Sequence, residues 1–159
     1  MTRHPWRMAL LVALAVGLTL PAGAQERKAP VAPKLVSVAE TKLIMAGMTM
    51  PNHGGIAHQL EKKPADVETW AFVRGQALLV AESGNLLMLR PPKNQGQDAW
   101  MRNAAELRET GTELARQAAA RDYDKTRAAL GDLTNTCNRC HQTFQVPVRV
   151  GPAEDERKP

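Results

Sequence analysis

Apolar residues recur every three or four positions over most of the chain beyond residue 35, which is the spacing of one face of an α-helix. This part of the sequence has no convincing strand-like alternation. Three of the apolar faces are continuous: Trp70, Val73, Ala77, Val80, Gly84 and Leu87; Trp100, Ala104, Leu107, Gly111, Leu114 and Ala118; and Tyr123, Thr126, Leu130, Leu133, Cys137 and Cys140. The pattern predicts three long helices, with both cysteines on the core-facing side of the last one.

An earlier helix is predicted from about residue 37 to residue 62. Ser37 and Glu40 have the spacing of a capping box, in which a hydroxyl and a carboxylate satisfy free amides at a helix start. One face of this helix comprises Val38, Thr41, Met45 and Met48. Because proline lacks an amide donor, Pro51 is expected to kink or interrupt the helix before the apolar positions resume.

Short connections separate these helices. Proline and aspartate at Pro64–Asp66 suit the start of the second helix, Arg90-Pro91-Pro92 ends it, Asp98 is expected to cap the third, and Arg121-Asp122 forms a turn before the fourth. Four helices with short turns close most simply as an all-α, antiparallel four-helix bundle. Alanine and glycine on the inner faces allow close approach, while the tryptophans add bulk, a combination that suits a bundle with room for a flat cofactor.

The N-terminal residues have the organisation of a secretory signal peptide, assigned to residues 1–24. Basic residues precede the apolar run Met8–Leu20, and Ala22-Gly23-Ala24 supplies an Ala-x-Ala cleavage site. Cleavage after Ala24 would leave Gln25 as the mature N-terminus in the periplasm. The apolar run is shorter than the roughly 20 residues that span a bilayer, so stable membrane insertion after cleavage is not expected.

The remaining chain is expected to hold one domain. Residues 25–36 form a proline-rich linker, residues 37–145 the bundle, and residues 146–159 a flexible C-terminal tail. Loss of Arg3 and Arg7 with the signal lowers the formal net charge from +5 to +3. Since the basic residues are scattered among acidic ones, the composition argues against a nucleic-acid partner.

The chain's two cysteines lie in Cys137-Asn138-Arg139-Cys140-His141, which is the Cys-x-x-Cys-His attachment signature of a c-type haem. In such a site Cys137 and Cys140 form thioethers to the haem and His141 is the proximal iron ligand. Two alternatives are a thioredoxin-like redox pair and half of a zinc site. The first needs a sheet and a cysteine pair at a helix start, and the second needs further ligands.

The chain resembles the class II c-type cytochromes, the four-helix-bundle group that includes cytochrome c prime. The resemblance rests on the attachment motif near the end of the last helix, on the preceding Arg127–Leu133, and on a first helix that offers methionines. It implies one covalent haem c, whose distal side faces the first helix. A methionine there makes the iron six-coordinate, whereas an apolar non-ligand leaves it open to small gases. Bundles of this family often pair through their first two helices, which makes a homodimer a candidate assembly.

Met45 is the preferred distal ligand, because it lies on the inner face one turn before the Gly and Pro residues and best matches the family's methionine. Met48, on the same face, is the next candidate. Met50 points elsewhere on a regular helix unless Pro51 reorients it, and His53 could reach the iron only across a large kink. The same methionines and histidine also offer the soft ligands that Cu(I) prefers, which is a competing interpretation.

These residues favour a periplasmic cytochrome that carries electrons through a haem with His/Met ligation and exchanges them with redox partner proteins. The alternative is a five-coordinate haem protein that binds NO or CO. The histidines outside the motif provide no distal acid–base pair that we can place, so no enzymatic activity is predicted.

Overall fold

The computed structural model describes residues 34–94 and 96–151. The predicted signal peptide, most of the linker and the end of the tail lie outside these residues. The chain divides into two units, Met1–Lys34 and Leu35–Pro159. In the second unit the helical segments are α1 (Thr41–Ile44), the π-helix η1 (Met45–Thr49), α2 (Met50–Gln59), α3 (Val67–Met88), α4 (Gln97–Ala120) and α5 (Tyr123–Thr143). All regular secondary structure in the described residues is helical, and none of these helices is long and apolar enough to cross a membrane.

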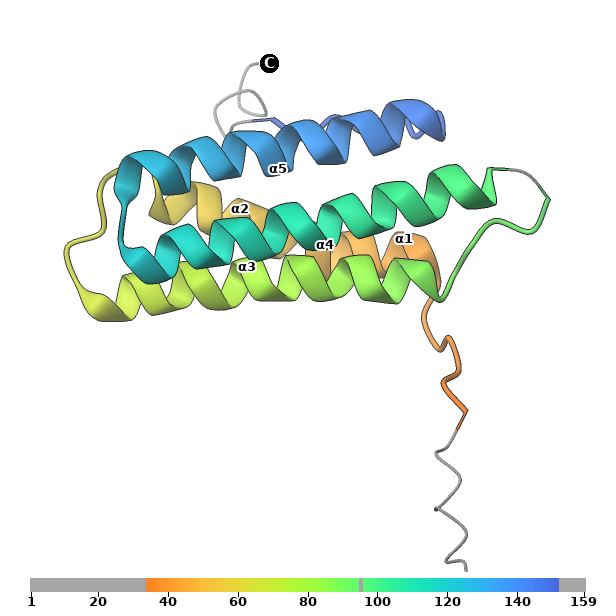
Figure 1. Ribbon diagram of the computed structural model, residues 1–159, viewed down its shortest axis with the longest axis horizontal. Helices are drawn as coiled ribbons and strands as arrows, with labels where there is room; N and C mark the ends of the chain where they lie inside the picture. The colour runs from red at the N-terminus through yellow and green to blue at the C-terminus, as the bar shows by residue number, and fades with distance from the viewer. Residues whose placement is uncertain (1–33, 95, 152–159) are drawn as a thin grey trace, which may run out of the picture. The chain divides into compact units, whose positions relative to one another are not determined.

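The segments α1, η1 and α2 follow one another without a break as one helix, and with α3, α4 and α5 they make four helices packed antiparallel (Figure 1). The predicted apolar faces form the core: Trp70, Val73, Ala77, Val80, Leu87, Ala104, Leu107, Leu114, Ala118 and Leu133 are all buried. The all-α bundle predicted from the sequence is therefore confirmed.

Two glycines allow α3 and α4 to pack closely. A Cβ at Gly84 would lie 2.6 Å from the carbonyl oxygen of Ala104, and one at Gly111 would lie 2.9 Å from the backbone nitrogen of Ala81. Side chains at these positions would meet backbone atoms, which cannot turn away. The glycines therefore set the distance between α3 and α4, the two longest helices. The end of α3 and the start of α4 carry part of the functional site.

The helix starts agree only in part with the sequence. Asp66 caps α3 by accepting a hydrogen bond from the Thr69 amide (2.6 Å), and Asp122 caps α5 in the same way. The predicted capping box is wrong, because the Ser37 hydroxyl donates to the Leu89 carbonyl (2.9 Å) and Glu40 is the N-cap of α1. Val38, placed on the inner face, is 94% exposed because it precedes the helix.

The N-cap of α4 also differs from the expectation. Asp98 lies inside the first turn, and the N-cap is Gly96, whose φ of 78° is in the left-handed region. Glycine adopts this conformation without the steric cost that a Cβ imposes. The loop therefore enters the helix two residues earlier than the aspartate suggests.

The first helix passes through Pro51 without interruption by widening to a π-helix immediately before it. The Met50 amide donates to the Met45 carbonyl, five residues back, instead of four. In a regular α-helix the Pro51 ring would clash with the carbonyl of Gly47, and Pro51 has no amide to donate to it. The wider turn relieves this conflict, and the side-chain amide of Asn52 donates a hydrogen bond to the Met48 carbonyl (2.6 Å). The expected disruption is thus a change of helical register.

The chain after α5 turns back against this helix. Val150 is buried, and both its backbone groups are hydrogen-bonded to the Asn138 side chain. Residues 146–150, assigned above to a flexible tail, therefore belong to the folded unit. We call this segment, Val146–Val150, the C-terminal strap.

Candidate functional site

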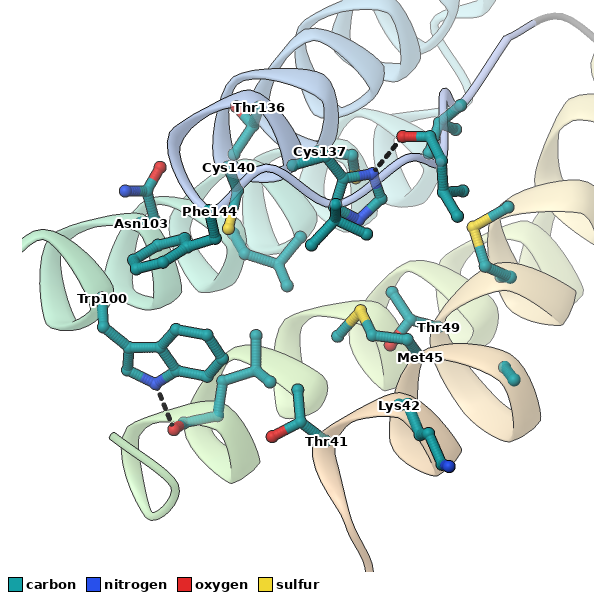
Figure 2. Close-up of a pocket in the computed structure, with 18 residues that line it drawn as sticks. Thr41, Lys42, Met45, Thr49, Trp100, Asn103, Thr136, Cys137, Cys140 and Phe144 are labelled. Carbon is teal, nitrogen blue, oxygen red and sulfur yellow. Dashed lines mark hydrogen bonds between the residues drawn. The ribbon is translucent and has the colours of Figure 1, made fainter. Parts of the chain in front are cut away.

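A cavity of about 420 Å³ lies at the end of the bundle where η1, α4, α5 and the C-terminal strap meet (Figure 2). This volume is within the range of about 300–1,000 Å³ that ligand pockets have. Its walls are almost entirely apolar. The lining residues are Thr41, Lys42, Met45, Ala46, Thr49, Met50, Leu87, Trp100, Asn103, Leu107, Thr136, Cys137, Cys140, His141, Phe144, Val146, Val148 and Val150.

Both cysteines line this cavity from α5, one turn apart and each partly buried. Burial, with a smaller effect of the neighbouring Cys140, raises the pKa of the Cys137 thiol to about 11. Burial also raises the pKa of Cys140, with a further contribution from Glu106. Redox-active Cys-x-x-Cys pairs lie at helix starts and have lowered pKa values. The opposite holds here, so the structure gives no support to a thioredoxin-like site.

His141 lines the same cavity and is held by the strap. Its Nδ1 lies 2.9 Å from the carbonyl oxygen of Val148. A carbonyl oxygen can only accept, so Nδ1 carries the proton and donates it. The neutral ring then keeps its lone pair on Nε2, which has no partner among the described residues. This arrangement, with the far nitrogen bound to a backbone carbonyl, is the usual one for a histidine that ligates a metal.

The methionines are distributed differently from the expectation. Met45 lines the cavity and packs against the core, as the sequence indicated, but its neighbour there is Met50 and not Met48. Met48 is half-buried and does not line the cavity. The π-helical turn is the physical reason, because it places residues five apart, here Met45 and Met50, on one face.

Neither His53 nor His58 lines the cavity. His53 is buried between α2 and α5, and its Nε2 lies 2.8 Å from the Thr134 hydroxyl. His58 is exposed and pairs with Glu61. With His53 engaged elsewhere and Met48 outside, the donors of the copper interpretation do not line one cavity.

The aromatic end of the cavity was only partly anticipated. Trp100, expected on the inner face of its helix, donates from Nε1 to the Leu87 carbonyl (2.7 Å), and its ring meets Phe144 edge-on at 5.1 Å between centroids. Figure 2 shows this pair at one end, with Cys140 and Met45 reaching in from opposite sides. Phe144 and the three valines of the strap were not identified from the sequence. The alternation of valine in Val146–Val150, typical of an extended segment, is the signal that could have found them.

Arg139, within the motif, does not reach into the cavity. Its guanidinium donates to Glu106 of α4 and to the Thr136 hydroxyl (3.0 Å). This pair is more than two-fifths exposed on both sides, so it is expected to add little stability. It links α4 to α5 directly beside Cys140.

The residues around the cavity fit a covalently attached haem. Two thiols one turn apart, an imidazole with a free Nε2, a thioether on the facing helix and apolar walls are the groups that such a ring and its iron require. The zinc interpretation lacks ligands: within the described residues, no group of three or more His, Cys, Asp or Glu side chains could hold a metal ion.

Comparison with known families agrees with this geometry. Residues 94–145, which include α4, α5 and the attachment motif, match the family described as Cytochrome C'. No curated protein and no solved structure matched the chain.

Proposed function

Since residues 94–145 match the Cytochrome C' family, we propose that this chain is a non-enzymatic haem protein of that family and an electron carrier whose iron is ligated by His141 and Met45. Family membership implies covalent haem c, and Cys137 and Cys140 are the cysteines that would hold it. When bound, the haem supplies a one-electron store. The chain's contribution is attachment, ligation and exclusion of water.

The placement of Met45 is the observation that carries the proposal. Met45 lines the same cavity as His141 but comes from the first helix, whereas His141 comes from the last. Two side chains that saturate the iron would leave its coordination nearly unchanged between the ferric and ferrous states, which favours electron transfer. A thioether ligand also raises the reduction potential relative to a second nitrogen ligand.

We also propose that residues 1–24 export the chain and that the mature protein starts at Gln25 in the periplasm. Haem attachment to Cys-x-x-Cys-His takes place outside the bacterial cytoplasm, so the motif and the signal support each other. The partners of an electron carrier in this compartment are redox proteins.

The proposal is tested by replacing each methionine near the cavity with leucine, which keeps the volume and removes the sulfur. In Met45→Leu we expect loss of the low-spin spectrum and of the near-infrared methionine-to-iron band. Met48→Leu, whose side chain lies outside the cavity, is the matched control and should keep both. Reduced Met45→Leu should bind CO rapidly, while the unaltered protein should bind it slowly.

Two results would contradict this assignment. Loss of the near-infrared band in Met50→Leu, and not in Met45→Leu, would make Met50 the ligand. A high-spin ferric spectrum in the unaltered protein, with rapid CO binding, would replace the electron carrier by the five-coordinate, gas-binding haem protein.

A further inference from the structure

The C-terminal strap is attached to the last turns of α5 by four hydrogen bonds. The Val146 amide donates to the His141 carbonyl (2.8 Å), and His141 Nδ1 donates to the Val148 carbonyl (2.9 Å). The other two join the strap to Asn138. Three valines of the strap also line the cavity, so the segment that covers the cavity is the one that holds the imidazole.

Asn138 anchors the far end of the strap. Its Nδ2 donates to the Val150 carbonyl (2.8 Å), and its Oδ1 accepts from the Val150 amide (2.9 Å). An amide side chain is suited to this role because it offers a donor and an acceptor in the same plane, as a peptide group does. Both backbone groups of the buried Val150 are thereby satisfied. Loss of this partner would leave two buried polar groups unpaired, which is costly.

The spacing links this anchor to the imidazole. Asn138 and His141 are three residues apart and therefore neighbours on one side of α5. Val150 and Val148 are two residues apart in an extended segment, where they lie about 7 Å from each other. Asn138 and His141 on the helix are therefore spaced to bind Val150 and Val148 of the strap, respectively. With Val150 fixed, the Val148 carbonyl is held opposite Nδ1.

We propose that Asn138 is a positioning residue for the iron ligand: it holds the strap so that the Val148 carbonyl fixes the tautomer and orientation of His141. The inference rests on the haem attachment and His141 ligation of the proposed function, and it is independent of the distal ligand. A hydrogen bond from Nδ1 raises the basicity of Nε2. A more basic ligand stabilises the ferric iron, so this bond lowers the reduction potential.

The test uses the full-length, haem-loaded protein and compares Asn138→Leu with Gln142→Leu. Leucine at 138 keeps much of the volume and removes both hydrogen bonds. Gln142 lies one turn further along α5 and is exposed, so its variant is the matched control. In Asn138→Leu we expect the Val150 amide and the Nδ1 proton of His141 to exchange faster with solvent, and the reduction potential to rise. In Gln142→Leu all three should stay unchanged.

Asn138→Asp adds a partial rescue, because its carboxylate can still accept from the Val150 amide. That amide should then exchange more slowly than in Asn138→Leu. Unchanged exchange at Val150 in Asn138→Leu would show that Asn138 does not hold the strap. Faster exchange at Val150 with an unchanged potential and an unchanged Nδ1 proton would show that the strap does not position His141. Both results overturn the inference, while absence of covalent haem in the unaltered protein would instead overturn the proposed function.

Discussion

At the scale of single residues, the burial of His53 couples the stability of the bundle to pH. The Thr134 hydroxyl donates to the Leu130 carbonyl (2.9 Å), so it accepts from His53, and Nε2 carries a proton in the neutral ring. Burial lowers the pKa of His53 below its ordinary value of 6.5. Below pH 6.5 the unfolded chain therefore binds more protons than the folded chain, and the free energy of unfolding falls as the pH decreases.

Substitution of His53 should remove this dependence. In His53→Gln the free energy of unfolding should vary less between pH 7 and pH 5 than in the unaltered protein, at a cost of about 1 kcal/mol at neutral pH for an altered buried hydrogen bond. Urea unfolding at several pH values measures both quantities. His58→Gln, at an exposed histidine, is the control and should retain the original slope. If the free energy of unfolding of His53→Gln changed with pH as much as that of the unaltered protein, the proposed coupling to His53 would be refuted.

The sequence was sufficient to identify the cysteines, the histidine and the methionine at position 45 that line the cavity, because each depends on spacing within one helix. Cys137, Cys140 and His141 are adjacent in the chain, and Met45 follows the apolar period of the first helix. The choice between Met48 and Met50 was beyond the sequence. It depends on how the backbone accommodates Pro51, and a π-helical turn reverses the answer that a regular helix gives.

At the scale of elements, helix positions were predictable where periodicity is long, and helix ends were predictable only in part. The faces of α3, α4 and α5 were read correctly because each continues over five or six turns. The N-cap of α4 was missed because Gly96 enters the helix through a positive φ, and a nearby Asp98 imitates a cap. The strap was missed because Val148 and Val150 are bound by the side chains of His141 and Asn138, and not by a neighbouring strand.

The close contact of α3 with α4 yields a second prediction. A Cβ at Gly111 would lie 2.9 Å from the Ala81 nitrogen and 3.1 Å from the Ala77 carbonyl oxygen, so Gly111→Ala must push the helices apart. We expect a loss of about 1–3 kcal/mol in the free energy of unfolding. Gly131→Ala, within α5 and with open space around it, should instead gain about 0.5–1 kcal/mol. Thermal or urea unfolding measures both, and a Gly111→Ala variant as stable as the unaltered chain would contradict the packing argument.

At the scale of the whole molecule, the cavity is assembled from segments that lie far apart in the sequence. Met45 comes from the first helix, Trp100 from α4, the attachment motif from α5, and the last wall from the strap beyond it. Periodicity predicts which side of each helix is buried, but it does not predict which helix ends meet. The family match covers residues 94–145 and so includes only two of the four helices. The wall that the first helix contributes to the cavity, which includes Met45, lies outside this match and is known from the structure alone.

Export and haem loading supply the last prediction, because the proposed signal peptide and the proposed haem attachment require the same compartment. In bacteria, haem is attached to Cys-x-x-Cys-His motifs outside the cytoplasm, and residues 1–24 have the organisation of an export signal. Deletion of residues 2–24 should therefore give a chain with no covalent haem, while the full-length chain should yield haem-stained protein on a denaturing gel, with Gln25 as its first residue by mass spectrometry. Replacement of residues 1–24 by an unrelated cleavable signal is the control and should restore the stain. Covalent haem on the deleted chain would show that loading does not depend on export, and the link between the motif and the signal would be lost.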